Sequence, residues 1–419
     1  MHDPGKRMGR ILVAGVAVIS LVATACVEER NAAGGATTGG GGVLKIGLVA
    51  PFSGTAASIG RNMREGVTIA VDELNAAGGI DGSRVEVVAR DNEFDPAKTS
   101  QIARELIDQD RVSLIIGPPG TTSYLAIDEL VRAKKVITMP VVTGPQLKEN
   151  LNPFTFRIMI PDDISVNQVV DYAAPRFSSI AVLSEDNETG RAITDLATAR
   201  MRKHGMKPAV REFFTEDELD LSPIVLKAKQ AGADAIIIGS HIGPYAARVA
   251  TAAESLDYSP QLLGLAGLTS YTYPDLARDA AVGTVFVAPP VPVIVGAANL
   301  PEAAKAFYEQ YSTRFFSDGT TSETGADKVT GAAYLTYDGV LMWARAVEQA
   351  GSADADAVAN VFNGGFTFGP DESSANIEWR YDANDHEGFH AADTWFYEWT
   401  QAGGDIKFEF LGEAAELTG

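Results

Sequence analysis

Short apolar runs alternate with longer segments whose apolar residues lie three or four positions apart along residues 43–145. The runs predict strands buried on both faces, and the segments predict helices that cover those strands. The predicted strands are 43–50, 84–90, 113–117 and 136–139, and the predicted helices are 62–77, 97–109 and one after the third strand. Such alternation predicts a doubly wound parallel sheet.

The same pattern restarts near residue 180 and predicts a second α/β domain. Its predicted strands are 180–183, 209–214, 235–239, 261–265 and 285–287, and its predicted helices are 188–203, 223–230 and 245–255. Two long amphipathic segments, 301–316 and 331–350, have no strand between them, so we expect them to pack on the first domain. Aromatic residues are frequent after Phe366 and predict β-hairpins there.

Residues 115–123 contain a candidate anion site. The run Gly117-Pro118-Pro119-Gly120 ends a predicted strand, and Thr121 can cap the helix that follows. Free N–H groups at a helix start attract anions, and open α/β sheets bind ligands at the carboxyl ends of their strands. Two interpretations remain open, namely a cradle for a ligand carboxylate and an ordinary turn with a threonine cap.

Length and charge narrow the function classes. A chain of 419 residues has room for two or three domains, and 46% apolar with 21% charged residues is typical of a soluble globular protein. The formal net charge of −21 argues against nucleic acid as a partner and against charge-driven docking on anionic lipid.

The N-terminus has the features of an export signal. Lys6, Arg7 and Arg10 precede an apolar stretch that ends at Ala25, and the single cysteine, Cys26, follows it. Residues 1–25 resemble a bacterial lipoprotein signal peptide, which implies that Cys26 is lipidated and anchors the protein to the outer face of the cytoplasmic membrane. A plain signal peptide with an incidental cysteine is the alternative. The Gly/Thr-rich residues 26–42 predict a flexible tether.

The whole chain from Val43 onward resembles the type I periplasmic binding proteins of the leucine/isoleucine/valine-binding branch, the receptors of ABC importers. The resemblance is carried by Lys45-Ile46-Gly47, Pro51–Gly54, Asn75–Gly82, Asp91–Pro96, Ile116-Gly117, Pro140–Pro145, Phe156-Arg157 and Gly369-Pro370. It implies two Rossmann-like lobes joined by a three-crossover hinge, with a ligand cleft between them. We expect lobe I at 43–160 plus 290–365, and lobe II at 161–289 plus 366–419.

The resemblance also implies a ligand site. Thr121, with Gly120 and Thr122 beside it, matches the residues that hold the ligand carboxylate in the family. Thr143 and Val141 match a second hydroxyl and a backbone carbonyl. The remaining three matches are His241, at the place of an aromatic residue that closes over the ligand, Ile59, at a position on the first lobe that is usually aromatic or polar, and Ala266.

Ala266 stands where amino-acid-binding members of the family have an acidic residue for the ligand ammonium. A methyl group cannot neutralise a buried ammonium. Either another acid reaches the site, with Asp162, Glu185 and Asp186 as candidates, or the ligand has no ammonium. A keto acid, an aromatic acid or an amide would satisfy the second alternative.

The run His386-Glu387-Gly388-Phe389-His390 matches the zinc-protease pattern, which requires both histidines on one helical face.

Three functions remain. The favoured one is a non-enzymatic, cofactor-free receptor that delivers a small molecule to an ABC permease. A ligand sensor for a signalling partner and a secreted metallohydrolase built on His386, Glu387 and His390 are the alternatives. The family default is a monomer.

Overall fold

The computed structural model describes residues 41–149, 152–290, 301–315, 331–402 and 405–418. The predicted signal peptide at 1–25, Cys26 and most of the tether at 26–42 lie outside these residues. In the described ranges, no helix is both long enough and apolar enough to cross a membrane.

The first sheet confirms the doubly wound pattern of the N-terminal part. Its strands run parallel in the order β2-β1-β3-β4. They are β1 (Val43–Ala50), β2 (Arg84–Asp91), β3 (Leu114–Pro119) and β4 (Ile137–Val141). Each begins and ends within two residues of its predicted bounds. Ile46, Leu48, Ile115 and Ile116 are fully buried, as expected for strands covered on both faces.

The helices that connect these strands are shorter than predicted at one place. They are α1 (Ala57–Ala76), α2 (Pro96–Arg104), a π-helical turn (Glu105–Asp110), α3 (Thr121–Leu125), α4 (Asp128–Lys134) and α5 (Gln146–Glu149). The single helix expected after β3 is broken between α3 and α4. Thr121 is not a cap, because Gly120 holds the N-cap position of α3 and no side chain caps this helix. The interpretation of Thr121 as a helix cap was therefore wrong.

The second sheet has the order β14-β13-β9-β8-β7-β5-β6. Its parallel part is β5 (Ile180–Glu185), β6 (Val210–Phe214), β7 (Ala235–Gly239), β8 (Gln261–Gly264) and β9 (Val285–Ala288), and β13 (Trp395–Ala402) and β14 (Asp405–Glu413) extend it antiparallel beyond β9. Its helices and turns are α6 (Asp162–Ala173), α7 (Glu188–Lys203), α8 (Ser222–Gln230), α9 (Gly243–Ser255), the 3₁₀ turn Ala266–Thr269, α10 (Thr272–Ala277), the 3₁₀ turn Arg278–Ala281, the 3₁₀ turn Ala391–Asp393 and α14 (Ala414–Thr418).

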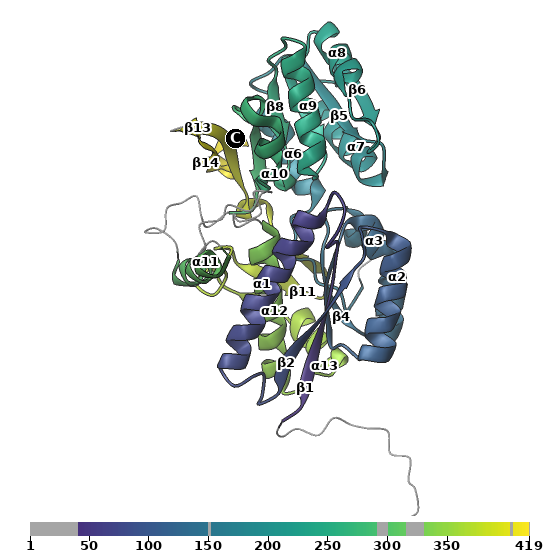
Figure 1. Cartoon of the computed structure of the whole chain (residues 1–419), viewed down its shortest axis with the longest axis vertical. Coiled ribbons are helices and arrows are strands. Elements are labelled where there is room, and N and C mark those ends of the chain that lie inside the picture. The colour runs from purple at the N-terminus through teal and green to yellow at the C-terminus, as the bar shows by residue number, and fades with distance from the viewer. Residues whose placement is uncertain (1–40, 150–151, 291–300, 316–330, 403–404, 419) are drawn as a thin grey trace, which may run out of the picture. The chain divides into compact units, whose positions relative to one another are not determined.

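Two long C-terminal helices return to the first sheet, as predicted. The elements of this part are α11 (Glu302–Phe315), α12 (Gly331–Ala350), α13 (Ala355–Asn363), β10 (Phe366–Phe368), β11 (Trp379–Asp382) and β12 (Asp385–Gly388). Helix α12 lies alongside α1 (Figure 1). Gly66 of α1 permits this contact, because a Cβ atom there would lie 1.9 Å from the carbonyl oxygen of Ala333. The expected two-lobed α/β fold is thereby confirmed.

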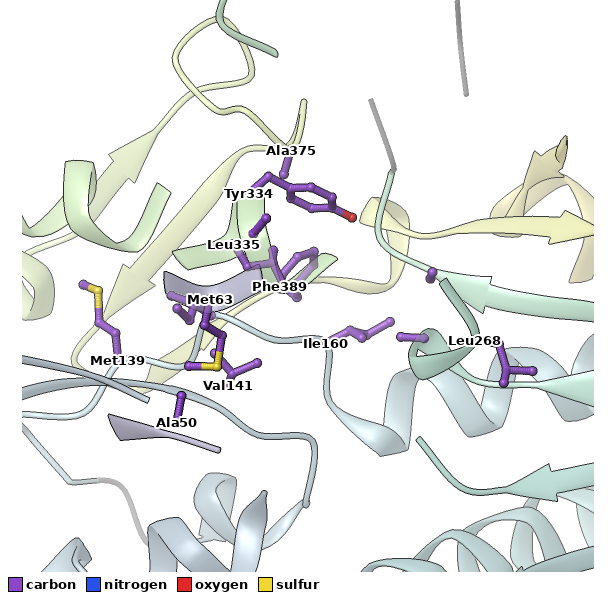
Figure 2. Packing of buried hydrophobic residues seen from close by; sticks show 14 of the residues in the cluster. Ala50, Met63, Met139, Val141, Ile160, Leu268, Tyr334, Leu335, Ala375 and Phe389 are labelled. Atoms are coloured by element: carbon purple, nitrogen blue, oxygen red, sulfur yellow. The ribbon is translucent and has the colours of Figure 1, made fainter. Parts of the chain in front are cut away.

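One predicted boundary was wrong, because strands β10–β12 do not join the second sheet. They form a separate three-stranded sheet that packs against α12 and α13, so residues 366–388 belong with the first part of the fold and not with lobe II. Figure 2 shows the resulting shared core, in which Phe389 and Ala375 lie near Tyr334 and Leu335 of α12 and Met63 of α1.

Asp338 of α12 gives the physical reason for this arrangement. Its side chain is 0% exposed and accepts hydrogen bonds from Ser373 Oγ at 2.6 Å, Ser374 N at 2.8 Å and Trp379 Nε1 at 2.9 Å. Burial raises the pKa of Asp338, and these three donors oppose that shift. The segment before β11 is therefore fixed to α12 by a polar cluster that water does not reach.

We expect Asp338→Ala to destabilise the fold by about 2–4 kcal/mol, because it leaves buried donors without an acceptor. Urea unfolding of the full chain measures the loss. Asp356→Ala is the matched control, since it removes only the exposed ion pair between Asp356 and Lys135 Nζ at 2.7 Å and should cost less than about 1 kcal/mol. Equal losses in the two variants would contradict the proposed role of Asp338.

Candidate functional site

A cavity of about 340 Å³ lies at the carboxyl ends of strands from both large sheets. Its lining includes eight of the nine predicted ligand residues, namely Ile59, Gly120, Thr121, Thr122, Val141, Thr143, His241 and Ala266. The ninth, Asp162, does not line the cavity but contacts His241. The structure thus brings the predicted residues together, and their contact with a ligand stays a prediction.

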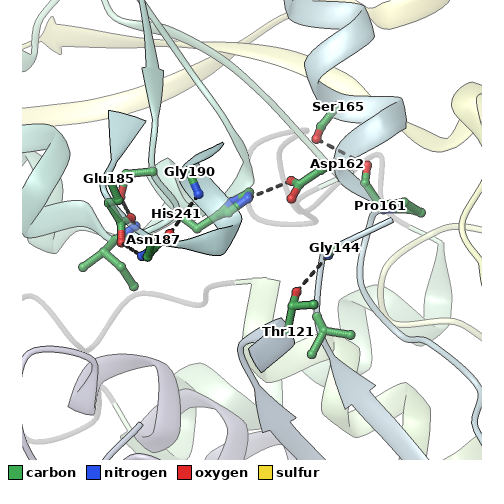
Figure 3. Close-up of polar contacts among 12 residues, drawn as sticks. Thr121, Gly144, Pro161, Asp162, Ser165, Glu185, Asn187, Gly190 and His241 are labelled. Atoms are coloured by element: carbon green, nitrogen blue, oxygen red, sulfur yellow. Dashed lines mark hydrogen bonds and ion pairs between the residues drawn. The ribbon is translucent and has the colours of Figure 1, made fainter. Parts of the chain in front are cut away.

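Thr121 is held by the loop that follows β4. Its side chain is 4% exposed, and its hydroxyl oxygen accepts the Gly144 N–H at 3.0 Å (Figure 3). Because the oxygen serves as acceptor, the hydroxyl proton remains available for a ligand acceptor. Gly120 has φ +85°, and a Cβ atom there would lie 2.8 Å from the Phe94 ring, so only glycine fits this turn.

Each carbonyl oxygen of the loop 142–144 accepts a hydrogen bond from another part of the protein. Arg157 donates from Nη1 to the Val142 oxygen at 3.3 Å and from Nη2 to the Gly144 oxygen at 2.7 Å. The Asp162 N–H donates to the Thr143 oxygen at 2.7 Å. These bonds fix the backbone that carries the Thr143 side chain at the cavity wall.

Arg157 itself is 1% exposed and pairs with Glu387 of β12, whose Oε2 lies 3.2 Å from its Nε. Burial lowers the pKa of Arg157 and raises that of Glu387, and the opposite charge of each partner opposes the shift. The sequence marked Arg157 only as part of the family pattern Phe156-Arg157. Its partner lies 230 positions away, so no local signal could have revealed the pair.

His241 follows β7 by two residues, and its ring Nε2 lies 2.8 Å from Asp162 Oδ1, so that an Nε2–H donates to the carboxylate oxygen (Figure 3). Asp162 is 0% exposed and begins α6, a helix that the sequence pattern did not reveal. Burial alone would lower the pKa of His241, but the nearby carboxylates of Asp162 and Glu185 outweigh burial and raise it. The contact therefore favours the imidazolium form.

Glu185, at the end of β5, lines the cavity. Ser240 Oγ donates to its carboxylate, and so does Asn187 Nδ2 at 2.7 Å. Burial raises its pKa, against the effect of these two donors and of His241. Among the described residues that line the cavity, Glu185 and His241 are the ionisable ones. Asp186, another candidate acid, instead pairs with Arg191 and does not line the cavity.

The zinc-protease interpretation was wrong. His386 and Glu387 lie on strand β12, so the helical face that the motif requires is missing. Both ring nitrogens of His386 have partners, with Nδ1 at 3.1 Å from the Asn152 oxygen and Nε2 at 2.7 Å from Asn363 Oδ1. The described part of the chain contains no group of three or more His, Cys, Asp or Glu residues placed to hold a metal.

The sequence pattern of the family described as "Periplasmic binding protein" matches residues 43–405, which is most of the chain. The chain belongs to this family. The family is one of solute-binding proteins and not of enzymes. Membership in it implies an extracytoplasmic location. It also agrees with the position of the cavity between strands of two α/β sheets.

Two curated relatives show the extent of the similarity. An "Amino acid binding protein" of Pseudomonas aeruginosa is 28% identical over 197 residues, 46% of this chain and 53% of that protein, so the match spans about half of that protein's length. The "Leu/Ile/Val-binding protein BraC3" of Rhizobium johnstonii is 25% identical over 330 residues, 77% of this chain and 84% of that protein.

Solved structures share the fold. A type 1 periplasmic binding protein from Bordetella pertussis has a TM-score of 0.78 at 22% identity, covering 88% of this chain and 100% of its own. A branched-chain amino acid binding protein from Streptococcus pneumoniae, in complex with isoleucine, has a TM-score of 0.72 at 21% identity, covering 88% and 99%. A solute-binding protein from Rhodopseudomonas palustris, in complex with p-hydroxybenzoic acid, has a TM-score of 0.75 at 19% identity, covering 89% and 97%.

The contact between His241 and Asp162 predicts a pH dependence of stability. A raised histidine pKa adds stability that is complete below the unfolded-state pKa of about 6.5 and is lost as the pH rises through the folded-state pKa. Asp162→Asn should therefore lower the melting temperature more at about pH 6 than at about pH 9. In a His241→Asn background the same substitution should show no such difference, and a pH dependence that survives there would assign the effect to another group.

Proposed function

We propose that this protein is the solute receptor of an ABC importer and binds a small carboxylate-bearing ligand in the 340 Å³ cavity. The observation that carries the proposal is the polarity of the described lining. Hydroxyl groups on a fixed backbone come from the first sheet, and the ionisable residues Glu185 and His241 come from the second. A ligand that contacts both sheets stabilises the closed arrangement of the two lobes, which is how hinge closure responds to ligand.

The carboxylate end of the ligand is assigned to Thr121, Thr143 and the backbone of Gly120. No lysine or arginine is among the described residues that line the cavity, and His241 contacts Asp162, so we assign the anion to the neutral donors of the first sheet. Hydrogen bonds to a charged group contribute about 1.5–3 kcal/mol each, which is enough for specific binding when the donors are fixed in place. The bond between Gly144 N–H and Thr121 keeps that hydroxyl in position.

The other end of the ligand is assigned to Glu185. Ala266 lines the cavity but offers no charge, whereas the Glu185 carboxylate also lines it and accepts hydrogen bonds from the neutral side chains of Ser240 and Asn187. An ammonium group placed there would compensate a carboxylate that burial has made costly to ionise. The acceptor oxygen of a keto acid would face that carboxylate unfavourably. An α-amino acid with an apolar side chain is therefore the ligand class that we favour.

The remaining parts of the proposal concern location and partners. Cleavage before Cys26 and lipidation of that residue would leave residues 26–42 as a tether between the membrane and the receptor. The receptor would then act as a monomer at an ABC permease, as the resemblance to the leucine/isoleucine/valine-binding branch implies. A signalling partner in place of the permease would use the same cavity.

We expect Thr121→Val to weaken binding of the best ligand about tenfold or more, because it removes the hydroxyl proton assigned to the carboxylate. A thermal-shift screen of the branched-chain amino acids, their keto acids and aromatic acids finds that ligand. A ligand at about a hundred times its dissociation constant should add about 2.7 kcal/mol of stability. Thr121→Ser keeps the hydroxyl and is the matched control. Unchanged affinity in Thr121→Val would refute the carboxylate assignment.

Glu185→Gln should weaken L-leucine about tenfold or more and leave the keto acid of leucine unaffected or improved, since only the amino acid has an ammonium to lose its partner. Isothermal titration of both compounds measures the two affinities. Asp186→Asn, next in the chain but outside the lining, is the control. Equal weakening of both compounds would show that Glu185 supports the fold and does not select the ligand.

A further inference from the structure

We propose that Arg157 is a positioning residue for the carboxylate end of the ligand, and that the C-terminal segment 386–389 holds Arg157 in place through Glu387. The proposal rests on the proposed function for the identity of that end. It assigns a role to the segment that the sequence marked as a possible zinc motif. It also assigns a role to Arg157, whose buried guanidinium bonds the cavity loop.

The first step concerns the carbonyl oxygens of loop 142–144. A carbonyl oxygen directed at a ligand carboxylate would repel it. The guanidinium of Arg157 takes the oxygens of Val142 and Gly144, and the Asp162 N–H takes that of Thr143. All three carbonyl oxygens are therefore bonded within the protein. The loop can still offer a ligand hydrogen-bond donors, among them the hydroxyl of Thr143, which lines the cavity.

The second step links the loop to Thr121. The Gly144 oxygen accepts from Arg157 while the Gly144 N–H donates to Thr121 Oγ1. The peptide group before Gly144 is therefore bonded to the predicted ligand hydroxyl of Thr121. The peptide group after Gly144 is bonded to the buried guanidinium of Arg157. Loss of the guanidinium would free the loop and, with it, the orientation of the Thr121 proton.

The third step explains why Arg157 stays in position. The segment 386–389, together with Tyr381 of β11, contacts both its backbone and its side chain. The Arg157 N–H donates to the His386 oxygen at 2.9 Å, Tyr381 Oη donates to the Arg157 oxygen at 2.8 Å, and Glu387 lies beside Nε. Gly388 allows this approach, since it has φ +66° and a Cβ atom there would lie 2.7 Å from the Arg157 oxygen.

Lysine could not replace this arginine. The planar guanidinium reaches two carbonyl oxygens and a carboxylate in three directions at once, whereas an ammonium is a point charge on a flexible stem. Arg157→Lys is therefore a stringent substitution, because it keeps the charge and removes the geometry.

Hydrogen exchange of the full chain without ligand provides the first test. In Arg157→Lys, the backbone amides of a peptide spanning about residues 140–146 should exchange about tenfold faster or more, because the loop opens locally. Glu387→Gln should change the same peptide in the same direction. Asp338→Ala, which destabilises the fold elsewhere, and Arg211→Met, which removes an exposed ion pair with Asp195, should not single out this peptide. Exchange as slow as in the unmodified chain would overturn the proposal.

Titration with L-leucine provides the second test. If the unmodified chain binds L-leucine, Arg157→Lys should bind it about tenfold more weakly or worse, and Asp338→Ala should bind it nearly normally when still folded. Equal affinity in Arg157→Lys and the unmodified chain would overturn the positioning role. Failure of the unmodified chain to bind L-leucine would count against the proposed ligand class, and the exchange experiment would then decide on Arg157 by itself.

Discussion

The contacts of the buried Arg157 guanidinium are the interactions on which the proposed ligand site depends. Removing an ionised group from water costs several kcal/mol, and only an opposite charge with further hydrogen bonds can offset that cost. Here the compensation comes from Glu387 and from two carbonyl oxygens of loop 142–144. A set of contacts made for electrostatic reasons thus also determines the shape of one cavity wall. The same contacts of Arg157 therefore offset the cost of its burial and fix the backbone of the cavity loop.

The distribution of charge around the cavity follows from the same arrangement. Arg157 and Glu387 compensate each other outside the cavity, so the anion-binding side is left with neutral donors. On the other side, Glu185 and His241 line the cavity, and His241 contacts Asp162. The proposed binding mode places the carboxylate of a zwitterion at Thr121 and its ammonium at Glu185.

Most strands and the cavity residues could be predicted from the sequence, whereas the contacts behind them could not. The strands are short apolar runs buried on both faces, a local signal that places β1 and β7 within two residues of their bounds. Strand geometry pointed to the turn at Gly120 and Thr121, and the family resemblance supplied the other predicted cavity residues. The pairing of Arg157 with Glu387 and of Asp338 with Ser373 depends on the return path of the chain, which local periodicity does not encode.

The segment His386–His390 shows why a motif has chemical meaning only with its backbone. On a helix, residues four apart share a face and can bind one metal ion. On β12, His386 instead bonds the Asn152 and Asn363 oxygens, while Glu387 pairs with the arginine behind the cavity loop. His386 and Glu387, which in a protease would bind a metal ion and activate water, here contact Asn152, Asn363 and Arg157. The buried position of Glu387 is explained by Arg157, since a guanidinium removed from water needs an opposite charge and hydrogen-bond acceptors.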